Sequence, residues 1–401
     1  MNIIVMKFGG TSVAGIEKIN NIADIVFKEV KKSKVVVVLS AMAGETNKLQ
    51  SYLDHFVSQN SMESDLVLTS GEQVTIGLLS ASLKNKDVKS IPLLGWQIPI
   101  VTDNNHENAK ILYIDNKRIH KYFEKNDVIV LAGFQGISLD GKITSLGRGG
   151  SDTTAVAIAS SVKAERCDIY TDVDGVYTTD PNIYQNAKKI SKMSYEEMLE
   201  MASTGAKVLH TRSVELAMKN NLTLQVLSSL TKEKGTFIVD EKKLIEKEIV
   251  SGVSYSKNEA KVTISGILDK PGISAKIFSL MTENNINVDM IVQNISQDGI
   301  LANITFTINQ KDYDLTKSVL ENNNNELDYK SLSLDKNVAK ISVIGMGMMS
   351  QSGVAEKMFK TLAKNAINIL AISTSEIKIS VLIDEKYTNI AVKSLHEVYN
   401  L

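Results

Sequence analysis

The stretch Ile3-Ile4-Val5-Met6-Lys7-Phe8-Gly9-Gly10-Thr11-Ser12 joins a short apolar run directly to two glycines. Residues 16–30 follow with apolar side chains at helical spacing, and residues 35–39 are apolar throughout. A strand that is apolar on both faces is typical of a sheet covered by helices on both sides. This opening therefore predicts an α/β fold that begins strand, helix, strand.

The same alternation continues to about residue 230. Residues 128–132 and 169–170 are apolar runs, and residues 153–162 and 194–201 have helical patterns. Repeated alternation of strand and helix implies a mostly parallel central sheet.

The last 150 residues or so contain a repeat instead. Residues 260–266 resemble residues 339–345, about 80 residues later, and a period of this size indicates duplicated small domains. Each copy reads as strand, glycine turn, helix and two further strands. The second copy lacks a last strand, and we expect residues 249–253 to complete its sheet. The asparagine-rich tract 321–326 is predicted to be a solvated turn.

Composition narrows the class of protein. The 401 residues suggest two or three domains at about 150 residues each. Lys and Arg number 45 and Asp and Glu 46, so the net charge of −1 offers no overall field for nucleic acid or an anionic membrane. The single cysteine, Cys167, excludes a disulfide framework. No secretory leader or apolar stretch of about 20 residues is evident, and we expect a soluble, cytoplasmic protein.

Two glycine-rich motifs carry candidate chemistry. In the first, Gly9 and Gly10 would let the backbone approach a phosphate while Lys7 adds a positive charge, although a plain strand-end turn explains them too. In the second, Arg148 lies among glycines, and its planar fork matches a carboxylate. Ser151 or Asp152 after it could equally be a helix cap.

Other signals are weaker. Asp172 and Asp174 lie two apart after a strand, where they could hold a hard cation or form an ordinary Asp-Gly turn. The five histidines are far apart and show no zinc-ligand spacing, so no metal site built from a cluster of side chains is expected. No G-x-S-x-G elbow occurs, which leaves acyl-transfer hydrolysis without support.

Taken together, residues 7–12, 40–42, 69–72, 147–154 and 171–181 resemble the aspartokinases of the amino-acid kinase superfamily. The repeats resemble that family's two ACT domains. The resemblance implies a three-layer α/β kinase domain at 1–235, a linker and strand at 236–259, and βαββαβ ACT domains at 260–336 and 339–401. It also implies transfer of the γ-phosphoryl group of ATP, carried with Mg²⁺, to the β-carboxylate of L-aspartate, the first step towards lysine, diaminopimelate, threonine and methionine.

The resemblance further implies residue roles. The catalytic residues would be Lys7, Asp152 and Lys207. The nucleotide would contact Lys7, Phe8, Gly9, Gly10, Ser40, Ser151, Thr171, Asp172, Tyr177, Asp180, Pro181, Asn182 and Lys207. Aspartate would contact Thr46, Glu72, Arg148, Gly149, Gly150, Ser151 and Asp152. An effector, lysine or threonine, would contact Asp269, Gly272, Asp289, Gln293, Asn294 and Asn368, and a homo-oligomer would form through the ACT domains.

Two rival functions stay open at this point. An acetylglutamate or glutamate kinase would share Lys7 and its glycines, but it is not expected to carry residues 69–72 together with 148–152. An amino-acid sensor with an inactive kinase domain is the second alternative, and intact Lys7, Arg148 and Asp152 disfavour it.

Overall fold

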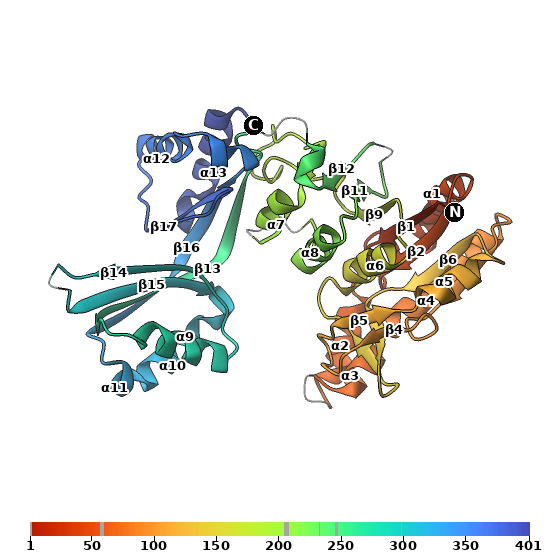
Figure 1. The fold of residues 1–401 in the computed structure, drawn as a ribbon, viewed down its shortest axis with the longest axis horizontal. Coiled ribbons are helices and arrows are strands. Elements are labelled where there is room, and N and C mark those ends of the chain that lie inside the picture. The colour runs from red at the N-terminus through yellow and green to blue at the C-terminus, as the bar shows by residue number, and fades with distance from the viewer. Residues whose placement is uncertain (1, 57–59, 204–207, 232, 245–247, 298) are drawn as a thin grey trace. The chain divides into compact units, whose positions relative to one another are not determined.

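A computed structural model describes residues 2–56, 60–203, 208–231, 233–244, 248–297 and 299–401 (Figure 1). The chain forms two compact units. The first contains Met1–Val176, Lys189–Ala202 and Lys207–Glu246. The second contains Tyr177–Lys188, Ser203–Ala206 and Lys247–Leu401.

The first unit is built on an eight-stranded sheet that is parallel except where β11 meets β12, which confirms the predicted mostly parallel sheet. Neighbouring strands β9, β1, β2 and β6 form its centre, and their residues are buried except at the strand ends, where Lys34, Arg166 and Thr171 are half-buried. In sheet order the strands are β10 (Lys192–Ser194), β12 (Thr236–Val239), β11 (Leu224–Ser228), β9 (Arg166–Thr171), β1 (Ile3–Phe8), β2 (Lys34–Leu39), β6 (Val128–Ala132) and β3 (Ser90–Leu93).

Helices cover both faces of this sheet. Helix α1 (Ile16–Val30), which matches the predicted range, packs with α4 (Gly71–Lys84) on the face that carries Ile4, Met6 and Phe8. Helix α6 (Gly150–Ser161) packs against β1 and β2 and pairs with α8. The remaining helices are α2 (Glu45–Leu53), α3 (Met62–Leu68), α5 (Asn116–Phe123), α7 (Tyr195–Ser203) and α8 (Thr211–Lys219).

A second, four-stranded sheet has the order β5-β4-β7-β8. Its strands are β4 (Ile100–Thr102), β5 (Ile111–Ile114), β7 (Gln135–Ser138) and β8 (Ile143–Ser145). Runs of three or four residues are too short to show the alternation that identifies a strand, so the sequence did not predict this sheet. It matters for function because β8 leads directly into the glycine loop that contains Arg148.

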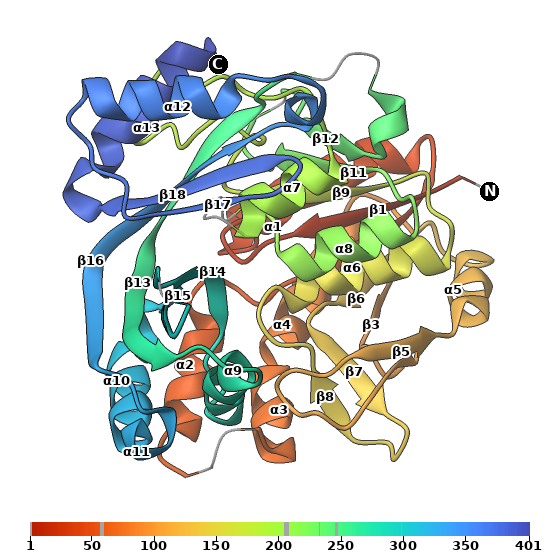
Figure 2. The same cartoon turned by 60° about the vertical axis from the view of Figure 1, so that its left-hand side comes forward.

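The second unit is one six-stranded antiparallel sheet shared by both repeats, in the order β14-β15-β13-β16-β18-β17. The long strands β13 and β16 run side by side, pairing Val262 with Leu334 in one half and Val253 with Val343 in the other. Figures 1 and 2 show α9 to α11 at one end of these strands and α12 with α13 at the other. The strands are β13 (Gly252–Leu268), β14 (Val288–Ile295), β15 (Leu301–Asn309), β16 (Ser331–Ile344), β17 (Ala371–Thr374) and β18 (Lys378–Asp384).

Two separate cores fill this unit, one under α9 (Ile273–Glu283), α10 (Tyr313–Asn322) and α11 (Asn324–Leu327), the other under α12 (Val354–Lys364) and α13 (Thr388–Tyr399). Residues 321–326 are mostly exposed, as predicted, but they form the end of α10 and most of α11 around a turn at Asn323 rather than a single turn. Leu320 and Leu327, on either side of them, are buried in the first core.

One helical stretch, Met62–Lys84, is long and apolar enough to cross a membrane by length and composition alone, a test that core helices also pass. It comprises α3 and α4, and 56% of its apolar 18-residue window is buried. Because it also carries the buried acids Asp65 and Glu72, we interpret it as a pair of core helices.

Candidate active site

The site begins where β1 ends, next to the ends of β9 and β2. The amide of Gly9 donates to the carbonyl of Tyr170, at 3.2 Å, and the carbonyl of Gly10 accepts from the amide of Ala43, at 3.1 Å. A Cβ atom on Gly10 would lie 2.9 Å from the carbonyl oxygen of Ala41, so only glycine fits there. In parallel sheets ligands bind beyond the carboxyl ends of the strands, which is where this turn lies.

Lys7 and Asp152 form an ion pair at this turn. The Lys7 Nζ lies 2.6 Å from Asp152 Oδ1, and both side chains are nearly buried. The same Nζ would lie 3.4 Å from a Cβ on Gly9, which places the ammonium beside the glycine turn. The side chain of Phe8, unlike that of Lys7, points into the core: its ring is fully buried and stacks on Tyr170 with 4.4 Å between centroids. Only the backbone of Phe8 could contact a ligand.

Glu72 lies buried in the first turn of α4, with 3% of its surface exposed. Its Oε1 accepts from the amide of Ala41, at 3.0 Å, which ties α4 to the segment after β2. Its Oε2 is also buried and has no hydrogen-bond partner among the residues the structure describes. Burial raises the pKa of this carboxyl to about 7. A buried acceptor without a partner is costly, so this oxygen is suited to a donor supplied by a ligand.

The loop from Gly147 to Gly150 joins β8 to α6. Arg148 is exposed, and no hydrogen bond or ion pair of its side chain occurs within the described part of the chain. Gly149 has φ +69° and a Cβ there would lie 2.4 Å from His210 Cγ, so glycine is required on both grounds. Gly149 occupies the N-cap of α6 without any side-chain cap. The alternative that Ser151 or Asp152 serves as the helix cap is therefore excluded.

Ser151 is buried, and its hydroxyl oxygen would lie 2.8 Å from a Cβ on Gly133, just after β6. Thr46, in the first turn of α2, is half-buried. Ser40 follows β2, and its carbonyl accepts from the Thr75 hydroxyl at 3.0 Å. Lys207 lies outside the described residues.

The two acidic residues after β9 do not pair up around a cation. Thr171 donates to Asp172, at 3.0 Å, whereas Asp174 forms an ion pair with Lys189, at 2.9 Å. Among the described residues no three His, Cys, Asp or Glu side chains lie together as a metal site would need. The alternative of an Asp172–Asp174 cation site therefore has no support.

Four residues predicted to contact the nucleotide, Tyr177, Asp180, Pro181 and Asn182, belong to the second unit. There Asp180 accepts a hydrogen bond from the hydroxyl of Tyr255, at 2.9 Å, and another from the amide of Asn182, at 2.8 Å. Their role at the nucleotide stays a prediction.

Three of the six predicted effector residues line one cavity of about 310 Å³ at the start of α9: Asp269, Gly272 and Gln293. Within it Gln293 donates to Asp269, at 3.3 Å, and accepts from Ser274, at 3.2 Å. The other three do not line this cavity. Asn294 and Asn368 are exposed, and Asp289 forms an ion pair with the buried Lys340 of β16.

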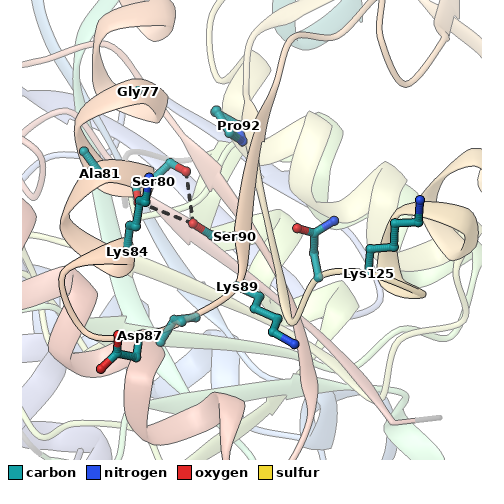
Figure 3. Close-up of a pocket in the computed structure, with 11 residues that line it drawn as sticks. Gly77, Ser80, Ala81, Lys84, Asp87, Lys89, Ser90, Pro92 and Lys125 are labelled. Carbon is teal, nitrogen blue, oxygen red and sulfur yellow. Dashed lines mark hydrogen bonds between the residues drawn. The ribbon is translucent and has the colours of Figure 1, made fainter.

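A larger cavity of about 550 Å³ lies beside α4 and β3 (Figure 3). Lys84, Lys89 and Lys125 surround it, and Ser80 is hydrogen bonded to Ser90 at 3.0 Å. It opens at the amino ends of β3 and β6, whereas Lys7 lies at the carboxyl end of β1. It is therefore separate from the candidate active site.

Known proteins match the whole chain. The sequence profile of the amino acid kinase family covers residues 2–228, and that of the ACT domain covers residues 262–323 and 341–399. An aspartate kinase of Pseudomonas putida is 48% identical over 404 residues, which span 100% of this chain and 98% of the relative.

Solved structures give the same result. Aspartokinase III of E. coli in complex with aspartate and ADP matches with a TM-score of 0.80 and 26% identity over 99% of both chains. Its complex with lysine and aspartate matches with a TM-score of 0.77, also at 26% identity, over 98% of this chain and 99% of that one. On this evidence of sequence and fold, the chain belongs to the aspartate kinases of the amino acid kinase family, with C-terminal ACT domains.

Proposed function

We propose that the enzyme transfers the γ-phosphoryl group of ATP to the β-carboxylate of L-aspartate, giving 4-phospho-L-aspartate and ADP. The observation that carries this proposal is the buried Oε2 of Glu72, which has no hydrogen-bond partner among the described residues and lies near the backbone turn that follows Lys7. A buried carboxylate suits the ammonium group of an amino acid, and the related E. coli enzyme was crystallised with aspartate and ADP.

The chemistry needs few protein groups. A substrate carboxylate with a pKa near ~3.9 is already ionised at neutral pH, so its attack requires no general base. Phosphoryl transfer then depends on positioning and on stabilising the charge of the transferring group. Lys7 can supply that charge, since its ammonium lies beside the glycine turn and its partner Asp152 holds it in place.

The substrate groups can be matched to the side chains by charge. Asp152 is already neutralised by Lys7, so Glu72 is the better partner for the ammonium of aspartate. Arg148, which has no partner among the described residues, would take a carboxylate through its planar fork.

ATP would bring Mg²⁺, which binds oxygen ligands and is held in kinases largely by the phosphates themselves. Asp152 and Asp174 are paired with lysines, which leaves the exposed Asp172 as a carboxylate suited to a metal–nucleotide complex. When bound, the ion would neutralise phosphate charge.

A coupled assay of ADP release tests the function and both rivals. We expect turnover with L-aspartate and none with L-glutamate or N-acetyl-L-glutamate. Turnover with one of the latter two would favour a neighbouring kinase of the superfamily. No turnover with any of the three substrates would favour the inactive sensor.

Arg148→Lys should raise the KM for aspartate about tenfold, because the ammonium of lysine cannot make the paired hydrogen bonds of a guanidinium. The KM for ATP should stay within twofold of wild type. Arg118→Lys is the matched control, since Arg118 is an exposed arginine on α5 of the same unit. If the KM for ATP rises while that for aspartate holds, Arg148 serves the nucleotide instead.

We further propose that the cavity at the start of α9 binds a feedback effector, lysine or threonine. The carboxylate of Asp269 and the amide of Gln293 offer partners for the charged backbone groups of an amino acid. The complex of the related E. coli enzyme with lysine supports this. We also expect a cytoplasmic homo-oligomer assembled through the ACT sheet, acting at the first step towards lysine, diaminopimelate, threonine and methionine.

Gln293→Ala should relieve inhibition by lysine or threonine, with uninhibited turnover nearly unchanged. An effector acts through its different affinities for two states, and coupling of about 1–3 kcal/mol corresponds to a ~5–150-fold change in affinity. The measurement is turnover against effector concentration. Gln310→Ala, at a half-buried glutamine outside the cavity, is the control. If millimolar lysine and threonine leave wild-type turnover unchanged, the proposal of feedback regulation is wrong. The proposed kinase activity would be unaffected by that result.

A further inference from the structure

Asp65 of α3 is an acidic residue with none of its surface exposed. Neither lysine nor arginine forms an ion pair with it among the residues described. Its Oδ1 accepts from the hydroxyl of Ser145, at 2.5 Å, and from the amide of Glu107, at 3.0 Å. Its Oδ2 lies 2.7 Å from Nδ1 of His106. A buried carboxylate is tolerated only with such a full set of partners, so these three contacts determine its position.

The partners of Asp65 come from two segments far apart in sequence. His106 and Glu107 lie in the loop between β4 and β5, and Ser145 is the last residue of β8. The carbonyl of Ser145 also accepts from the amide of Ala109, at 2.9 Å. Asp65 therefore joins α3, this loop and the end of β8 into one assembly.

The glycine loop that carries Arg148 rests on this assembly. A Cβ on Gly147 would lie only 2.8 Å from the carbonyl oxygen of Glu107, so the two backbones are in close contact. Arg212 of α8 joins the two segments, because its guanidinium donates to the carbonyl of Leu146, at 2.8 Å, and to that of Ala109, at 2.7 Å. The side chain of Arg148 forms no hydrogen bond or ion pair with the described residues. Its position therefore depends on how the backbone of the 147–150 loop is held.

We propose that Asp65 is a positioning residue for aspartate binding, acting through Ser145 and the turn at His106 and Glu107 to hold the 147–150 loop. The inference rests on the proposed role of Arg148 in binding a substrate carboxylate. Three glycines give this loop great conformational freedom, and ordering it only when substrate binds would cost affinity. A loop that is already ordered avoids that cost for aspartate and leaves ATP binding unaffected.

Ser145→Ala tests the inference in the full-length enzyme, because it removes one hydrogen bond and little volume. Losing a net contribution of about 1 kcal/mol should raise the KM for aspartate roughly fivefold, with the KM for ATP within twofold. Asp65→Leu removes both acceptor oxygens and keeps a side chain of similar size, so it should raise the KM for aspartate further. Asp65→Asn should restore most of the affinity, because its amide oxygen can still accept from Ser145 and Glu107.

Thr144→Val is the matched control. Thr144 is the neighbouring buried residue of β8, and its hydroxyl bonds to that of Thr102, at 2.6 Å, away from the loop. It should lower the melting temperature and leave the KM for aspartate within twofold. An equal rise in this KM for Thr144→Val and Ser145→Ala would mean a merely structural effect and would overturn the inference.

The outcomes separate this inference from the proposed function. If wild type phosphorylates aspartate but Ser145→Ala leaves its KM within twofold, the positioning role fails and the function stands. If wild type does not phosphorylate aspartate, both fail. Should Asp65→Leu not fold, Ser145→Ala and Asp65→Asn still decide the question.

Discussion

Lys7→Ala is expected to lower the turnover of aspartate by ~10²–10³, the size of effect seen when one group that stabilises transition-state charge is removed. The ammonium of Lys7 lies beside the glycine turn at the end of β1, where we place the phosphates. The measurement is kcat from ADP release at saturating aspartate and ATP. Turnover within threefold of wild type would contradict the assignment.

Stability must be separated from catalysis here, because removing Lys7 leaves Asp152 nearly buried without its cation. Breaking one partner out of a buried ion pair commonly costs about 3–5 kcal/mol. The double variant Lys7→Ala with Asp152→Asn removes that charge, so it should recover thermal stability without recovering turnover. Lys34→Ala is the matched control, since Lys34 pairs with Asp127 at the opposite end of the same sheet. Its turnover should equal that of wild type.

Glu72→Gln should lower kcat/KM for aspartate at pH 8 by ~30-fold or more, since losing one partner of a buried charge pair costs about 2–5 kcal/mol. In wild type burial raises the pKa of Glu72 to about 7, so this carboxyl is about half protonated in the free enzyme at pH 7 and largely ionised at pH 8. The ammonium of aspartate needs the carboxylate. We therefore expect wild-type kcat/KM for aspartate to rise between pH 6 and pH 8, and the variant to lack this rise.

The same pKa predicts an opposite effect on stability. A carboxyl whose pKa is raised from 4.5 to about 7 binds its proton more tightly in the folded state, so the free energy of unfolding falls as pH increases through this window. The loss is of order 3 kcal/mol. Glu72→Gln should therefore melt at a higher temperature than wild type at pH 8, with little difference at pH 4. Equal melting temperatures at pH 8, or identical pH profiles, would show that Glu72 does not titrate as described.

Several features were predictable because they are local in sequence. The apolar run of β1 and the helical periodicity of residues 16–30 appear in adjacent residues, and both elements were found where expected. The ACT repeats were evident because two copies of one pattern lie in the same chain. The motifs around Lys7 and Arg148 were recognisable because each keeps its glycines next to its charged residue.

What the sequence by itself determined is thus the central strand and helix pattern, the repeats, the family and the contiguous glycine motifs, because periodicity and turn chemistry depend on neighbouring residues. Only the tertiary structure decided that Lys7 pairs with Asp152, that Oε2 of Glu72 has no partner among the described residues, and that Asp65 bonds to Ser145. It also decided that β13 and β16 serve both repeats. These contacts join residues far apart in the chain, and burial and packing, which no local pattern records, select them.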